Sequence, residues 1–149
     1  MSLVTNIADA VAAELGRGEF STEFTAQRRV LPDFELKDLG ELKVSVVPHA
    51  VEIAKETRDS QRYEVTIDIG VQQKITDSID TQVAALGTLV DEIAEFLTNR
   101  PLEDAPYANW SAIENDPVYV PEHLKQRRVF TSVLSVTYQM LKIVTPPSH

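Results

Sequence analysis

The chain has 149 residues, of which 43% are hydrophobic and 25% are charged, and its formal net charge is −9. This length and composition are typical of a globular protein with one core, so we expect a single domain over residues 1–149. The acidic balance argues against a broad nucleic-acid-binding surface, because such surfaces hold phosphates with lysine and arginine. The sequence contains no cysteine, which excludes disulfides, thiolate zinc sites and cysteine nucleophiles.

Membrane and export signals are also missing from this sequence. No apolar run approaches the length that spans a bilayer, and the N-terminal segment MSLVTNIADAVAAELG carries acids in place of the basic start of a signal peptide. We therefore expect a soluble, unexported protein with no membrane partner.

A short helix is predicted near the N-terminus. Apolar residues recur there at helical spacing from Val4 to Leu15. Ser2 or Thr5 is placed to cap the first turn, and Gly16 ends the helix.

Two strands are predicted next, followed by a charged tip. The segment EFTAQRRVLP alternates and closes at Pro32, and LKVSVVP alternates and stops at Pro48. Residues 49–61 continue as a strand extension and then as KETRDSQ, which has no apolar side chain. We interpret Lys55 to Gln61 as an exposed, mobile loop that becomes ordered when a partner docks.

The longest predicted strand is RYEVTIDIGVQQKI, from Arg62 to Ile75. Successive side chains of a strand point to opposite faces, so one face is apolar and the other carries Glu64 and Asp68. The apolar face belongs to the core, and the polar face meets solvent or a partner. Gly70 in the strand interior indicates a bulge or the close approach of another backbone.

A long amphipathic helix follows in TDSIDTQVAALGTLVDEIAEFLTNRP. Asp77 or Ser78 is placed to cap it, and Pro101 follows its end. Its apolar stripe is broad enough to pack on a sheet. The stripe consists of Ile79, Val83, Leu86, Val90, Ile93 and Leu97.

The C-terminal third contains irregular structure and two strands. Prolines break residues 102–124, where we expect one short strand from Trp110 to Glu114. The segment RRVFTSVLSVTYQMLKI then predicts a last strand. The order of elements indicates an α+β fold, with a mainly antiparallel four- to five-stranded sheet packed against one long and one short helix.

The sequence contains none of the common catalytic or cofactor-binding motifs. No glycine-rich phosphate loop is present, and the histidines at 49, 123 and 149 lack metal-ligand spacing. Ser111 and Ser132 lack the G-x-S-x-G elbow of hydrolases. Turns explain the remaining acids better than a cation site or an acid–base pair does. These acids are Glu103, Asp104, Glu114 and Asp116. We therefore expect no catalytic residue, metal or cofactor, and no enzymatic activity.

Arginines are the candidate interface residues. Two basic pairs, Arg28–Arg29 and Arg127–Arg128, precede or enter strands, so one member of each pair should lie on the solvent or partner face. A solvated strand end is the alternative interpretation. Arginine is enriched at interfaces and pairs bidentately with carboxylates, so these residues, with Arg58 in the charged tip, are candidates for subunit or partner contacts.

The order of segments resembles that of small structural proteins of tailed bacteriophages, most closely the tail terminator (neck) group. The resemblance rests on the short N-terminal helix, FTAQRRVLPDFELKDLGELKVSVVP, the charged loop, YEVTIDIGVQQKI, the amphipathic helix and HLKQRRVFTSVLSVTY. It covers nearly the whole chain. These are core and strand patterns, so head-completion and head–tail joining proteins remain alternatives, and a small-ligand-binding α+β domain is a third.

This resemblance implies a non-enzymatic homo-oligomeric ring, usually a hexamer, in the neck or tail of the virion and assembled in the host bacterial cytoplasm. Such a ring caps the tail tube protein, offers a docking surface to head connector or adaptor proteins, and lets genomic DNA pass without specific binding. A basic wall would retain DNA, so Glu64 and Asp68 are the lumen-facing candidates.

Overall fold

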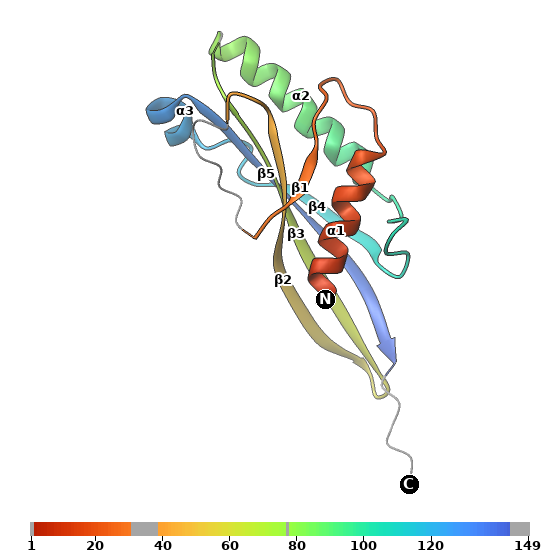
Figure 1. The fold of residues 1–149 in the computed structure, drawn as a ribbon. Coiled ribbons are helices and arrows are strands. Elements are labelled where there is room, and N and C mark those ends of the chain that lie inside the picture. Colours follow the sequence, from red (N-terminus) through yellow and green to blue (C-terminus); the bar gives the residue numbers. More distant parts are fainter. Residues whose placement is uncertain (1, 31–38, 77, 144–149) are drawn as a thin grey trace.

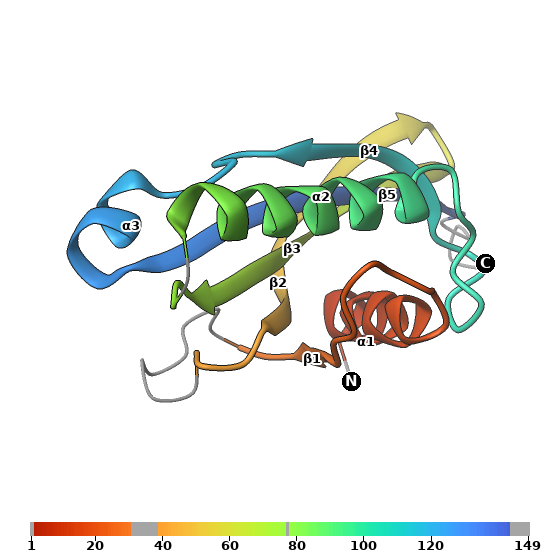
Figure 2. The ribbon, with the colours of Figure 1, turned by 90° about the horizontal axis from the view of Figure 1, so that it is seen from above.

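A computed structural model of the chain describes residues 2–30, 39–76 and 78–143. The elements are α1 (Leu3–Gly16), β1 (Ala26–Arg28), β2 (Lys43–Thr57), β3 (Ser60–Lys74), α2 (Ile79–Leu97), β4 (Asn109–Asn115), α3 (Pro121–Arg127) and β5 (Val129–Ile143). The five strands form one sheet in the order β1-β2-β3-β5-β4 (Figures 1 and 2). None of the described helices is long and apolar enough to cross a membrane.

The α+β class predicted from the sequence is confirmed, but two details differ. The sheet is mixed, because β1 runs parallel to β2 while the other neighbouring strands are antiparallel. The described residues also form three helices where two were expected. The additional helix, α3, begins at Pro121, a residue that is tolerated in the first turn because the N–H it lacks has no partner there.

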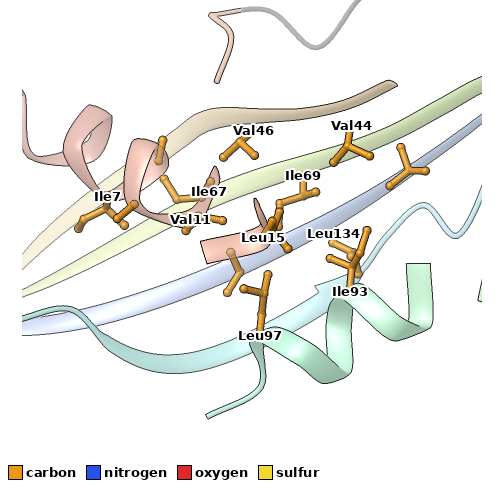
Figure 3. Packing of buried hydrophobic residues seen from close by; sticks show 14 of the residues in the cluster. Ile7, Val11, Leu15, Val44, Val46, Ile67, Ile69, Ile93, Leu97 and Leu134 are labelled. Atoms are coloured by element: carbon orange, nitrogen blue, oxygen red, sulfur yellow. The ribbon is translucent and has the colours of Figure 1, made fainter. Parts of the chain in front are cut away.

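The core lies between one face of the sheet and the helices α1 and α2. Alternate residues of β3 from Val65 to Val71 are fully buried on this face, as the alternating pattern predicted. Figure 3 shows α1, α2 and three strands contributing side chains to the same cluster. The labelled members are Ile7, Val11, Leu15, Val44, Val46, Ile67, Ile69, Ile93, Leu97 and Leu134.

Both predicted helices are present, with different N-terminal arrangements. The Ser2 hydroxyl accepts a hydrogen bond from the Thr5 N–H at 3.2 Å and caps α1. At α2 the N-cap residue Ser78 makes no side-chain capping bond, and the other expected cap, Asp77, lies outside the described residues. Ile79, expected in the apolar stripe, is 39% exposed.

Gln82 instead connects β3 to the first turn of α2. Its side-chain oxygen accepts a hydrogen bond from the Thr76 N–H at 3.0 Å. Its amide group donates to the Lys74 carbonyl, also at 3.0 Å. A residue inside the helix therefore fixes the path by which the chain enters it.

The predicted end of the second strand at Pro48 is wrong. β2 continues through Pro48 to Thr57, because β1 covers only Val44 to Val46 and leaves Pro48 on an edge where no donor is needed. The register shifts between Pro48 and Ala50. The bulge considered at Gly70 is absent, since Gly70 pairs in regular register with β2 and β5.

The loop predicted from Lys55 to Gln61 is also wrong. β2 extends to Thr57 and β3 begins at Ser60, so only two residues form the turn. The Thr57 and Ser60 hydroxyls lie 2.7 Å apart and close the hairpin. The first predicted strand is shorter than expected, Ala26–Arg28, and its proposed end at Pro32 lies outside the described residues.

Candidate functional site

The second face of the sheet, here called the polar face, carries a network of polar side chains. Residues paired directly across antiparallel strands share a face, and the register therefore places Glu64 and Asp68 together on it, as predicted. The charged and polar residues of this face include Lys43, Glu52, Arg62, Glu64, Thr66, Asp68, Lys74, Glu114, Ser135, Thr137 and Gln139.

Hydrogen bonds join β3 to β5 across the polar face. The Ser135 hydroxyl donates to Asp68 Oδ1 at 2.7 Å, and the Gln139 amide donates to Glu64 Oε1 at 2.9 Å. His49 Nδ1 lies 2.7 Å from the other oxygen of Asp68. Both acids therefore hold the strands in register as well as contributing negative charge.

The residues Ser135, Asp68 and His49 have the side-chain types of a nucleophilic triad, but their order differs. In a triad the histidine lies between the hydroxyl and the carboxylate and takes the hydroxyl proton. Here the carboxylate lies in the middle, and the Ser135 hydroxyl donates to it directly. This arrangement orients the side chains and does not activate the serine.

The other acids considered from the sequence do not form a common site. Glu103 and Asp104 both pair with Arg17, at 3.3 Å and 3.2 Å, whereas Glu114 belongs to β4. The described residues contain no cluster of three or more histidine, aspartate or glutamate side chains suited to hold a metal ion.

The candidate interface arginines lie in three separate places. Arg28 in β1 forms an ion pair with Asp9 of α1, so it is used within the chain. The backbone N–H of Arg29 donates to the Val46 carbonyl at 2.9 Å. Arg58 is exposed in the turn between β2 and β3.

Arg127 and Arg128 lie at the end of α3, far from the β2–β3 turn (Figure 1). Arg128 has left-handed backbone angles, φ 51° and ψ 47°, and its carbonyl accepts a hydrogen bond from the Ile75 N–H at 2.7 Å. Both side chains are exposed. The structure therefore does not gather the five arginines into one patch.

The ends of β2, β3 and β5 extend beyond α1 as a three-stranded ribbon (Figure 1). We call this ribbon the arm and define it as residues 51–57, 60–65 and 140–143. Val65 and Met140 at its base are buried, but four aliphatic side chains are exposed and lie on both faces. They are Val51 (42%), Ile53 (55%), Leu141 (65%) and Ile143 (77%).

Both long edges of the arm are open among the described residues. β1 pairs with β2 only as far as Val46, and β4 pairs with β5 only as far as Gln139. The alternation of Val51 and Ile53 with Glu52 predicts the inner part of the arm as a strand extension, in agreement with β2. The outer part, from Lys55, was predicted as a loop and is a strand hairpin instead.

A groove lies at the other end of α1, with a volume of about 1150 Å³. It is lined by the last residues of α1, the segment 18–27 and the start of β2. Phe20 and Phe24 contribute aromatic surface, with ring centroids 5.1 Å apart. Glu19, Glu23 and Glu41 add exposed carboxylates to the lining.

Comparisons with known proteins add no family. No protein-family model matches the chain, and no curated protein matches it either.

Proposed function

We propose that this chain is a non-enzymatic structural subunit of a closed homo-oligomeric ring, a hexamer, in the neck of a tailed bacteriophage. In this role the ring terminates the tail tube and docks with head connector or adaptor proteins. The proposal is supported by the order of the sequence segments and by surfaces that suit assembly better than catalysis.

The observation that carries the proposal is the arm. Its four exposed aliphatic side chains point to both faces of the ribbon. Each square ångström of apolar surface removed from water stabilises an assembly by about 25 cal/mol. Contact of a neighbouring subunit with the core side of the ribbon would bury Val51 and Ile53, whereas an isolated subunit leaves them in water.

The polar face supports the proposed passage of DNA. Four carboxylates, Glu52, Glu64, Asp68 and Glu114, share it with three basic side chains, Lys43, Arg62 and Lys74. Arg62 is paired with Glu56 at 3.0 Å and Lys43 with Glu41 at 3.9 Å. A surface with this excess of carboxylates repels phosphates. We place this face toward the lumen of the ring.

Imaging of the purified protein and of tail preparations tests the ring. Electron microscopy and native mass measurement over a range of concentrations should give closed rings of six copies, present at the head-proximal end of tails. Rings found on head vertices in the absence of tails would favour a head-completion protein instead. A single copy per particle, with a monomer at every concentration, would reject the proposal.

A charge-reversal pair tests the lumen. Glu64→Lys with Asp68→Lys should allow tails to form but slow genome ejection. Asp91→Lys with Glu95→Lys is the matched control, because it makes the same charge change on the exposed surface of α2. Normal ejection from normally assembled particles of the first variant would contradict a lumenal polar face. Failed assembly of a first variant whose thermal unfolding matches wild type would place this face at a subunit contact.

A further inference from the structure

We propose that the arm of each subunit docks into the groove of the next copy of this chain. The inference rests on the proposed ring and identifies the two surfaces that would build it. Both surfaces belong to the same chain but do not overlap, so the contact is head-to-tail.

The face of the arm that continues the core side of the sheet combines apolar and basic groups. One cross-strand row consists of Ile53, which is 55% exposed, Tyr63, which is partly exposed, and Met140, which is buried in the core cluster. The next row outward consists of Lys55, Gln61 and Lys142. The carboxylates Glu52 and Glu64 alternate with these residues and therefore point to the opposite face.

The groove offers the complementary chemistry. Phe20, Phe24 and Leu42 give its lining an apolar part that accepts aliphatic side chains. Glu19 and Glu23 are exposed and add negative charge. A volume of about 1150 Å³ exceeds that of a typical small-ligand pocket, so it has room for several side chains of a strand. Val51 and Ile53, the exposed aliphatic side chains of this face, would enter the groove while the two lysines meet glutamates.

The geometry makes this contact intermolecular. The arm lies beyond the N-terminal end of α1 (Figure 1), whereas Leu15 and Gly16 at its C-terminal end line the groove. The 14 residues of α1 separate the two surfaces by roughly 21 Å at 1.5 Å per residue. A head-to-tail contact between unlike surfaces repeats from copy to copy and closes into a ring when the rotation permits.

Cysteine cross-linking tests the contact directly, because the chain has no native cysteine. Thr22→Cys labels the groove, and Ile53→Cys labels the docking face of the arm. A mixture of the two variants, treated with a short thiol-specific cross-linker, should give covalent dimers that neither variant gives alone. Glu52→Cys, on the opposite face of the arm, is the matched control and should cross-link several-fold less to Thr22→Cys.

Charge reversal supplies an independent test. Lys55→Glu with Lys142→Glu should weaken self-association several-fold, and so should Glu19→Lys with Glu23→Lys. All four side chains are exposed, so thermal unfolding should stay unchanged. A chain that carries all four substitutions should regain assembly, because the charges are exchanged and still opposite.

The outcomes separate this inference from the proposed function. A wild-type chain that never assembles would overturn both. Rings that persist in every charge variant, without arm-to-groove cross-links, would overturn the docking contact and leave the ring standing. Cross-links between two Ile53→Cys copies would show a symmetric contact, and cross-links from the arm only to other virion proteins would show a different partner. Either result would also overturn the inference.

Discussion

Arg100 Nε donates a hydrogen bond of 2.7 Å to Glu14 Oε2, although the two residues are 86 positions apart in the sequence. The Glu14 side chain is only 4% exposed. Its other oxygen accepts from Arg17 at 3.1 Å and from the Glu103 N–H at 3.0 Å. One carboxylate thus joins the end of α1 to the segment that follows α2.

Replacing this carboxylate should destabilise the fold. We expect Glu14→Ala to lower the free energy of unfolding by about 2–4 kcal/mol, because Arg100 and the Glu103 N–H both lose a charged acceptor. Urea denaturation measures the change. Glu95→Ala, an exposed site on α2, is the control and should stay within about 0.5 kcal/mol of wild type. Equal stability of both variants would contradict a structural role for Glu14.

Acid should weaken the same network. Burial by itself raises the pKa of Glu14, but the hydrogen bonds from Arg100 and Glu103 and the charges of Arg100 and Arg17 outweigh it, so this pKa lies below its ordinary value of 4.5. The contribution is therefore complete above the unfolded-state pKa and is lost as pH falls through the folded-state pKa. We expect wild-type stability to fall more steeply below about pH 4.5 than that of Glu14→Gln. If the stability of both proteins falls in parallel with pH in that range, the proposed contribution of Glu14 ionisation is contradicted.

Tyr138 should be replaceable without loss. Its side chain is fully buried, and its hydroxyl has no hydrogen-bond partner within the described structure. We expect Tyr138→Phe to be neutral or to stabilise by up to about 1 kcal/mol at neutral pH.

Burial, with a smaller effect of Glu14, raises the pKa of Tyr138 above its ordinary value of 10.0. Wild-type stability should consequently fall above that pH, because only the unfolded chain ionises there, and Tyr138→Phe should lack this loss. Unfolding curves of both proteins at neutral and alkaline pH test these expectations. A Tyr138→Phe variant that is clearly less stable than wild type at neutral pH would refute them.

Gln82 should stabilise the entry to α2. We expect Gln82→Ala to cost about 1–2 kcal/mol, since the Thr76 N–H and the Lys74 carbonyl both lose a partner. Gln82→Glu should lose less, because a carboxylate still accepts from Thr76 and favours the helix N-terminus but cannot donate to Lys74. The thermal unfolding temperature should be highest for the wild type, lower for Gln82→Glu and lowest for Gln82→Ala. An alanine variant as stable as wild type would disprove the role of Gln82.

Hydrogen exchange should distinguish the arm from the core. In residues 51–57, the backbone amides that point away from β3 should exchange rapidly in free subunits, because no described strand pairs with that edge of β2. They should become protected on assembly. Amides of β3 from Val65 to Val71 should be slow in both states. Exchange in the arm that is identical before and after assembly would contradict its place at an interface.

Local patterns explain what was predicted correctly. The alternation from Tyr63 to Val71 assigns each side chain of β3 to a face because the period of a strand is two. The helical spacing of Ile7, Val11 and Leu15 does the same for α1. These assignments need no information beyond a few neighbouring residues.

Features that depend on distant residues were missed. A proline interrupts a strand only where a neighbouring strand needs the backbone N–H that proline lacks. The sequence around Pro48 does not tell where the neighbouring strand β1 ends. Asp68 was placed on the correct face, but its partners His49 and Ser135 lie 19 and 67 positions away. The lack of apolar side chains in KETRDSQ predicts a loop. A strand exposed on both faces has the same composition.

The position of β5 also sets an order of events during synthesis. β5 is the last described element in the chain, yet it lies between β3 and β4 in the sheet. Thr66 and Thr137 face each other across this pairing although 71 positions separate them. A nascent chain on the ribosome can form the β2–β3 hairpin and α2, but β3 keeps one open edge until β5 emerges, and such distant pairing is slow. Because β5 also supplies one strand of the arm, the three-stranded arm cannot form before residues 129–143 have left the ribosome.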